Sequence, residues 1–241
     1  YFKEKNFQKA EEIALKITRK FSDHTLAWNI LGLILESKNQ FAKAMNAYQK
    51  AISTSQNDPN LFYLYFNLGN SLQALNKTNE AIENYEKSIK LNPNFFASYA
   101  NLAYAHHKLG NLNEAIKSYK KAIKLNNKSP ETFNNLGNLH RELGAFNESI
   151  KSLHEAIKLN PNYAKAHNNI AKSYEKIGKL DEAIFFYEKA IKIDPNLFEA
   201  EAHLIFTKKN ICDFSISNKI SNLSSKLGIS TKSIPPFLAL S

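Results

Sequence analysis

The sequence predicts an all-α solenoid built from repeated helix-turn-helix units. The first observation is a repeat with a period of 34 residues, visible in the similar segments AIENYEKSIKLNPN, AIKSYKKAIKLNNK, SIKSLHEAIKLNPN and AIFFYEKAIKIDPN. The second is that small and large apolar residues recur at fixed places in each unit. The third is that glycine, asparagine and proline recur between these segments, where helices would end. A fixed period of this length is typical of arrays in which stacked helix pairs share one core.

The period divides the 241 residues into units. Five full units are expected at 25–58, 62–95, 96–129, 130–163 and 164–197, with a short insertion near Pro59. Residues 1–24 are expected to be the end of an earlier, truncated unit. Residues 198–210 are predicted to form a capping helix that resembles the first helix of a unit, and residues 211–241 to form a connector to a further domain.

Each unit is predicted to contain two helices that approach closely, because small residues stand at fixed places in both. In the first helix these residues are Gly32, Gly69, Ala103, Gly137 and Ala171. In the second helix they are Ala44, Ala81, Ala115, Ser149 and Ala183. Large side chains are expected to fill the space beside them, namely Tyr48, Tyr85, Tyr119, Leu153 and Tyr187. We interpret all of these as packing residues.

The turns between the two helices of a unit are also predicted. They carry a residue that tolerates a left-handed backbone at a helix end: Asn39, Asn76, Gly110, Gly144 and Gly178. Prolines separate several units from the next, at positions 93, 161 and 195.

Composition excludes several classes of function. The net charge is +10, but lysine dominates, arginine occurs only at positions 19 and 141, and exposed aromatics do not alternate with the basic residues. We therefore expect a solvated lysine-rich surface and no nucleic-acid partner. No apolar run reaches the roughly 20 residues that span a bilayer, so no membrane partner is expected. A single cysteine, Cys212, favours a reducing compartment, and a cytoplasmic location is predicted.

No pattern in the sequence predicts catalysis or metal binding. The motifs GxxxxGK[ST], CxxC, HExxH and GxSxG do not occur. The adjacent His106 and His107 diverge by about 100° on a helix, and the other histidines are scattered over different units. We expect no catalytic residue, no metal ligand and no cofactor in this chain.

Residues 1 to about 210 resemble the tetratricopeptide repeat in length, order and residue type. The resemblance implies a right-handed superhelix whose concave groove is lined by the first helix of each unit and binds proteins or peptides. The residues expected to line the groove and bind a peptide are Asn67, Asn101, Asn135, Asn169 and His203 at the sixth position, with Asn70 and Asn138 three residues after two of them. A carboxamide both donates and accepts, so a ladder of asparagines could pair with any polypeptide backbone.

Two alternatives bear on this groove. Asparagine is common at the sixth position as an ordinary solvated residue, so the ladder could have no binding role. The lysine and arginine residues with which chaperone-binding repeats hold acidic C-terminal tails are missing at the fifth and sixth positions. A co-chaperone function is therefore not expected.

The last residues of the chain depart from the repeat. The spacing of Ile216, Ile220, Leu223 and Leu227 predicts one apolar helix face, which Asp213 could cap and Gly228 could end. The segment after it, STKSIPPFLALS, is rich in apolar residues. We interpret this tail as a connector that enters another domain.

The order of these features resembles bacterial relatives of the protein O-GlcNAc transferases. The residues that carry the resemblance are Ile211, Cys212, Asp213, Phe214, Pro236, Phe237 and Leu240, with Phe214 where the family usually has tryptophan. The resemblance implies an arm that recognises acceptor polypeptides for a glycosyltransferase domain beyond Ser241, with UDP-GlcNAc or a similar donor bound there. The alternative is a stand-alone scaffold for protein–protein interactions.

Overall fold

The structure, a computed structural model, describes residues 2–55 and 58–210. These residues form twelve helices and no strand, so the all-α prediction is confirmed. The helices are α1 (Phe2–Lys20), α2 (Thr25–Ser37), α3 (Phe41–Thr54), α4 (Leu61–Ala74), α5 (Thr78–Leu91), α6 (Phe96–Lys108), α7 (Leu112–Leu125), α8 (Pro130–Glu142), α9 (Phe146–Leu159), α10 (Ala164–Lys176), α11 (Leu180–Ile193) and α12 (Phe198–Asn210). The predicted connector, residues 211–241, lies outside the described residues.

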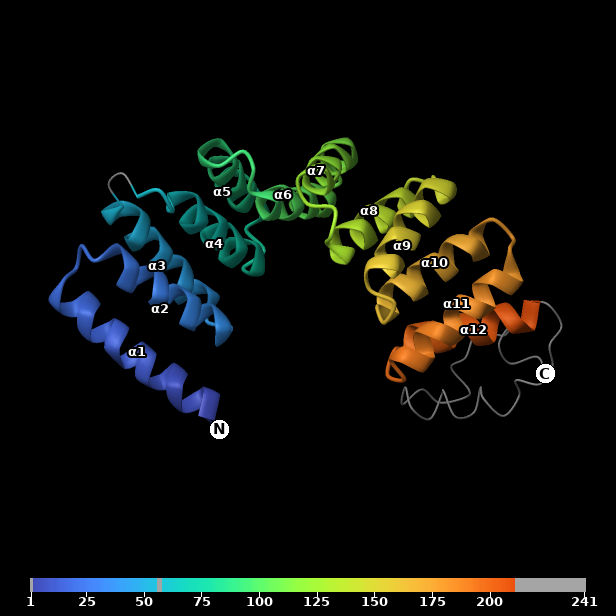
Figure 1. Ribbon diagram of the computed structural model, residues 1–241, viewed down its shortest axis with the longest axis horizontal. Helices are drawn as coiled ribbons and strands as arrows, with labels where there is room; N and C mark the ends of the chain where they lie inside the picture. The colour runs from blue at the N-terminus through green and yellow to red at the C-terminus, as the bar shows by residue number, and fades with distance from the viewer. Residues whose placement is uncertain (1, 56–57, 211–241) are drawn as a thin grey trace. The chain divides into compact units, whose positions relative to one another are not determined.

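The chain divides into two compact units, Tyr1–Asn127 and Lys128–Ser241. In the first unit, α1 packs on α2, and the pairs α2/α3, α4/α5 and α6/α7 stack in sequence (Figure 1). In the second unit, the pairs α8/α9 and α10/α11 stack in the same way, and α12 packs on α11. Within each unit the second helix of a pair contacts both its own first helix and the first helix of the following pair. The apolar faces of neighbouring pairs therefore share one core, as expected for a helical solenoid.

The predicted packing residues form this core. The side chains of Tyr48, Tyr85, Tyr119, Leu153 and Tyr187 are fully buried. The small residues predicted in the second helices are also fully buried: Ala44, Ala81, Ala115, Ser149 and Ala183.

The small residues of the first helices allow the two helices of a pair to touch. At Gly69, an added Cβ would lie 2.6 Å from Cε1 of Tyr85, and at Gly32 it would lie 2.5 Å from Cε1 of Tyr48. Leu153 takes the place of the tyrosine ring in the pair α8/α9, where a Cβ at Gly137 would lie 2.6 Å from its Cγ. Real Cβ atoms do not approach carbon this closely, so the ring of the second helix occupies the space that a larger residue would need.

The predicted left-handed turns are confirmed. The backbone φ is 57° at Asn39 and 61° at Asn76, and it is 78°, 74° and 76° at Gly110, Gly144 and Gly178. Each of these residues follows the first helix of a pair and turns the chain into the second. A positive φ lets the last carbonyl groups of the first helix accept hydrogen bonds from the turn, as when the amide of Ala145 donates to His140 over 2.9 Å.

These turns give the first testable prediction. We expect Gly144→Ala to lower the free energy of unfolding by about 1 kcal/mol, because a Cβ is unfavourable at positive φ. No neighbouring atom lies within 4 Å of the position that the Cβ would take, so the cost comes from the backbone alone. Gly144→Asn should cost less, because asparagine tolerates this conformation and the chain uses it at Asn39 and Asn76. Urea denaturation followed by circular dichroism measures the free energy of unfolding of both variants. An equal decrease in the two variants would contradict this account.

Candidate peptide-binding surface

The residues predicted to bind a peptide lie on the first helices of the pairs and are all partly exposed. In the first unit, Asn67 and Asn70 lie on α4 and Asn101 lies on α6. In the second unit they are Asn135 and Asn138 on α8, Asn169 on α10 and His203 on α12. The ladder is thus divided into one pair of sixth-position asparagines in each unit.

In the first unit, Asn70 connects three helices. Its Oδ1 accepts a hydrogen bond from Nδ2 of Asn101 over 2.7 Å and lies 3.0 Å from the hydroxyl of Tyr85, which donates to it. The same hydroxyl lies 2.9 Å from Oε1 of Gln73. Since the hydroxyl carries one proton, it donates to one of these oxygens at a time. Burial raises the pKa of Tyr85 far above its usual value, so the hydroxyl remains protonated and keeps donating.

This network leaves part of each carboxamide available to a ligand. Asn101 uses its NH₂ group on Asn70, and its own carbonyl oxygen can still accept. Asn67 forms no hydrogen bond with another described residue, so both ends of its carboxamide can engage a polypeptide. In contrast, Oδ1 of Asn70 already accepts hydrogen bonds from Tyr85 and Asn101, so Asn70 serves mainly to orient these two side chains.

In the second unit, Asn134 takes a similar connecting role. Its Oδ1 accepts from Nδ2 of Asn169 over 2.9 Å, and its Nδ2 donates to Oδ1 of Asn135 over 3.3 Å. Asn134 is 6 % exposed. From the sequence we considered its position only as one that lacks a lysine or arginine, so its part in the ladder was missed. The signal was the run of two adjacent asparagines, which also occurs at Asn168 and Asn169.

Asn138 is satisfied within its own helix. Its Oδ1 accepts from Nη2 of Arg141 over 2.6 Å, and its Nδ2 donates to Oε1 of Glu142 over 2.8 Å. Both partners lie one turn further along α8, so Asn138 joins no neighbouring helix pair through these bonds.

His203 belongs to a charged cluster rather than to the carboxamide ladder. Its Nδ1 lies 3.4 Å from Oε2 of Glu175, and its ring stacks on Tyr187 with centroids 5.6 Å apart and an interplanar angle of 10°. The hydroxyl of Tyr187 donates to the same Glu175 oxygen over 2.6 Å. Burial alone would raise the pKa of Glu175, but the hydrogen bonds from His203 and Tyr187 outweigh it and lower the pKa. The carboxylate therefore stays ionised beside α12.

At the N-terminal side of the first unit the corresponding face is apolar. On α2 the second, sixth and ninth positions of the repeat are Leu26, Ile30 and Leu33, which are 59 %, 38 % and 47 % exposed. On α4 the sixth and ninth positions are Asn67 and Asn70. The face of the first helices thus changes from apolar to carboxamide within one unit.

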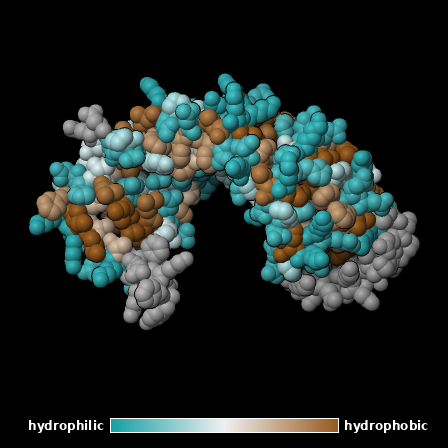
Figure 2. Space-filling view, in the orientation of Figure 1, coloured by the Kyte–Doolittle hydropathy of each residue, from teal (hydrophilic) through white to brown (hydrophobic). Residues whose placement is uncertain are grey.

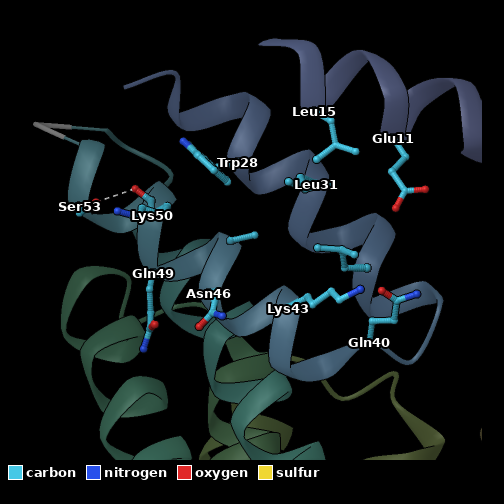
Figure 3. A pocket seen from close by; sticks show the side chains of 12 residues that line it. Glu11, Leu15, Trp28, Leu31, Gln40, Lys43, Asn46, Gln49, Lys50 and Ser53 are labelled. Atoms are coloured by element: carbon cyan, nitrogen blue, oxygen red, sulfur yellow. Dashed lines mark hydrogen bonds between the residues drawn. The ribbon is translucent and has the colours of Figure 1, made fainter. Parts of the chain in front are cut away.

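Three hollows lie elsewhere on the two units. One of about 790 Å³ is lined by α1, α2 and α3 (Figure 3). A second of about 710 Å³ is lined by α5, α6 and α7, and a third of about 570 Å³ by α9, α10 and α11. In each of them two consecutive second helices form the walls and the first helix between them forms the floor. None of these three contains a predicted ladder asparagine, so the hollows and the carboxamides lie on different surfaces. Figure 2 shows hydrophobic patches bordered by hydrophilic side chains on the face that it presents.

In the third hollow, His167 lies between α9 and α11. Its Nε2 lies 2.9 Å from the carbonyl oxygen of Pro161 and, because a carbonyl only accepts, this nitrogen is the donor. Burial lowers the pKa of His167, so it is neutral near pH 7. No group of three or more metal-ligating side chains occurs in the described part of the chain.

Across residues 2–55 and 58–210, no helix has the length and apolar character needed to cross a membrane.

The family models match segments that overlap the helix pairs described above. Models of the tetratricopeptide repeat match residues 26–58, 69–110, 107–144, 137–178 and 164–197. The chain belongs to the tetratricopeptide repeat family. The predicted resemblance to these repeats is thereby confirmed, whereas the association with a glycosyltransferase stays a prediction. No curated protein matches the chain.

Solved structures share the fold of this tetratricopeptide repeat chain. The crystal structure of MamA protein is 25 % identical, with a TM-score of 0.63, and the match covers 73 % of this chain and 94 % of that one. YrrB, described as a TPR protein with an unusual peptide-binding site, is 21 % identical with a TM-score of 0.63, and the match covers 80 % and 98 %. The C-terminal part of a TPR repeat-containing protein from Cytophaga hutchinsonii is 17 % identical with a TM-score of 0.71, and the match covers 96 % and 94 %.

The network around Asn70 gives the second prediction. Tyr85→Phe should lower the free energy of unfolding by about 1 kcal/mol, because the fully buried Tyr85 no longer donates to Asn70 or Gln73. The matched control is Tyr63→Phe on α4, whose side chain is 43 % exposed and which should change stability by less than about 0.5 kcal/mol. Urea denaturation of both variants measures the difference, and equal stabilities would show that the Tyr85 hydroxyl contributes nothing.

Proposed function

We propose that this chain is a protein-binding scaffold in which each unit holds extended polypeptide along the face of its own first helices. The observation that carries the proposal is the set of partly exposed carboxamides on consecutive first helices, Asn67 and Asn101 in one unit and Asn135 and Asn169 in the other. Each carboxamide can pair with a peptide group, which also has one donor and one acceptor. Such pairing depends on the backbone of the ligand and not on its side chains.

Hydrogen bonds within each unit prepare Asn101 and Asn169 for binding. The bond from Asn101 to Asn70 fixes the orientation of the carboxamide before a ligand arrives, and the bond from Asn169 to Asn134 does the same in the second unit. A side chain that is already ordered loses less conformational entropy on binding, which supports a higher affinity for the same contacts. The networks are thus compatible with a binding role as well as with a structural one.

The exposed apolar side chains of α2 support a preference for ligands with a bulky apolar residue. Leu26, Ile30 and Leu33 expose apolar surface on α2 next to the carboxamides of α4. A polypeptide whose backbone lies on Asn67 could place a bulky apolar side chain against α2. We expect such an anchor residue to distinguish favoured ligands from others, since burying it contributes about 1.5–3 kcal/mol.

The ladder is tested by replacing Asn67, Asn101, Asn135 and Asn169 together by alanine. A peptide selected from a random library on the unmodified chain serves as the probe, and isothermal titration calorimetry measures its affinity. We expect the affinity to fall by about tenfold or more, because each lost hydrogen bond is worth about 0.5–1.5 kcal/mol.

The matched control replaces four exposed asparagines of the second helices by alanine: Asn46, Asn79, Asn113 and Asn147. Its affinity should stay within about twofold of the unmodified chain. Circular dichroism melts confirm that both sets of variants fold. If the ladder variant binds the selected peptide as tightly as the control, the carboxamides have no binding role.

A finer proposal concerns what the scaffold serves. The order of Ile211, Cys212, Asp213 and Phe214 followed by Pro236, Phe237 and Leu240 supports an arm that presents acceptor polypeptides to a protein O-glycosyltransferase domain beyond Ser241. These residues lie outside the described part of the chain, so the support comes from sequence alone. On this proposal the donor, UDP-GlcNAc or a similar nucleotide sugar, binds in that domain and not in this chain.

This finer proposal predicts that the chain alone neither hydrolyses UDP-GlcNAc nor transfers the sugar to a polypeptide. Fused to its genomic continuation, the same chain should transfer it, with the ladder variant showing a raised KM for the acceptor and an unchanged KM for the donor. Radiolabelled sugar transfer measures both constants. Turnover by the isolated chain, or a continuation without a nucleotide-sugar domain, would favour the stand-alone scaffold instead.

A further inference from the structure

One hollow of the first unit differs from the others in charge. The hollow between α5 and α7 has apolar side chains at its base, Tyr99 and Leu102 on the α6 floor and Ile89 on the adjoining α5 wall. Its rim carries five lysines against two glutamates: Lys90, Lys117, Lys120, Lys121 and Lys124, with Glu86 and Glu114. We call this surface the basic hollow.

The equivalent hollow between α1 and α3 shows that the charge is not imposed by the fold. Asn46, Gln49 and Ser53 of α3 line that hollow (Figure 3). Alignment of the repeats places them at the positions that Lys117, Lys120 and Lys124 occupy in α7. The α7 wall therefore has four lysines and Glu114, whereas the α3 wall has two lysines, with Lys43 at the position of Glu114.

The lysines of α7 are not neutralised by the protein itself. Lys117, Lys120 and Lys124 are exposed, and none of them forms an ion pair with another residue in the described part of the chain. Lys121 lies over the ring of Tyr99, 5.8 Å from its centroid, and so connects the rim with the floor. At a rise of about 1.5 Å per residue, the row from Lys117 to Lys124 extends for roughly 10 Å along α7.

We propose that the basic hollow binds an acidic amphipathic helix of a partner protein. The apolar floor accepts one or two bulky side chains, and the spacing of the rim lysines at three and four residues matches carboxylates on one face of a helix. The attraction of several carboxylates to this rim accelerates association and selects acidic partners. This surface belongs to the second helices and the floor between them, so it is independent of the carboxamide ladder.

The chemistry of the hollow favours a protein partner over nucleic acid. Neither arginine of the chain lines it, and it has a single tyrosine for base stacking. Apolar side chains of a partner would be buried favourably against Ile89, Tyr99 and Leu102. A nucleic-acid backbone supplies no such side chains.

The test uses the full 241-residue chain and a fluorescein-labelled peptide built from EELEELL heptads, with fluorescence anisotropy as the readout. The rim variant combines Lys117→Asn, Lys120→Gln and Lys124→Ser, the residues that α3 has at these positions. The control variant removes the same charge elsewhere through Lys9→Gln, Lys151→Gln and Lys165→Gln, at lysines that are exposed and do not line the hollow. All six positions are on the surface, so both variants should fold, which circular dichroism verifies.

We expect the rim variant to bind the peptide about tenfold more weakly, and the control variant to stay within about twofold of the unmodified chain. A peptide with serine in place of every leucine should bind about tenfold more weakly than the leucine peptide, because it cannot fill the floor. Affinity of the leucine peptide should also fall as the salt concentration rises.

Four results would overturn the proposal. The first is no measurable binding of the leucine peptide to the unmodified chain. The second is an equal loss of affinity in the rim and control variants, which would mean that net charge alone matters. The third is equal binding of the serine and leucine peptides, which would exclude the apolar floor. The fourth is tighter binding of a single-stranded RNA of matched charge, lost in the rim variant, which would assign the hollow to nucleic acid.

Discussion

The close contact between the two helices of each pair is the constraint on which the other features depend. The Tyr85 ring lies on the backbone of Gly69 so closely that a Cβ would stand 2.6 Å from it, and Tyr48 and Gly32 repeat this arrangement one pair earlier. Because the ring fills the space between the helices completely, it fixes their separation and the rotation of each helix about its axis. That rotation decides which positions of each helix face the core and which reach the surface. Exchanging the ring for Leu153 preserves the same contact, so the requirement is for a large side chain against a small one.

The same ring connects the core with the candidate binding surface. The hydroxyl of Tyr85 emerges beside Asn70, which in turn holds Asn101 of the following pair. In the last described pair, the hydroxyl of Tyr187 meets Glu175, to which His203 of α12 is also joined. A core tyrosine thus orients the polar side chains of the surface above it. The chemistry of that surface depends on which residue accepts the hydrogen bond from the tyrosine hydroxyl. An amide there continues the ladder of carboxamides, whereas a carboxylate introduces charge.

The two helices of a pair present different chemistry to solvent. First helices carry carboxamides at Asn67 and Asn101, which suit an extended backbone, while the exposed side of α7 carries lysines above an apolar floor. The carboxamides lie on first helices and the rim lysines on second helices, so the two surfaces share no residue. A scaffold with this arrangement would hold a backbone in one place and an acidic helix in another, bringing two polypeptides together.

The sequence by itself determined the fold, because each repeat carries its own packing pair and its own turn. The recurrence of residues such as Gly144 and Asn76 at the turns, and of Tyr85 in the core, predicted left-handed turns and buried rings that the structure contains. These features are local or repeat at a fixed period, so they can be read along one chain. The sequence also located Asn101 on the candidate surface through its position in the repeat.

Only the tertiary structure decided how the polar side chains are paired. Asn134 serves as the acceptor for Asn169, and Asn70 as the acceptor for Asn101, because of the offset at which neighbouring helix pairs stack. Likewise, the basic hollow exists because stacking places Lys90 of α5 and the lysines of α7 around Tyr99 of α6. Periodicity specifies which face a residue occupies, but hydrogen-bond partners and hollows depend on distances of a few ångström between different repeats. Those distances are set by side-chain packing across the whole interface and cannot be derived from the spacing of residues in the sequence.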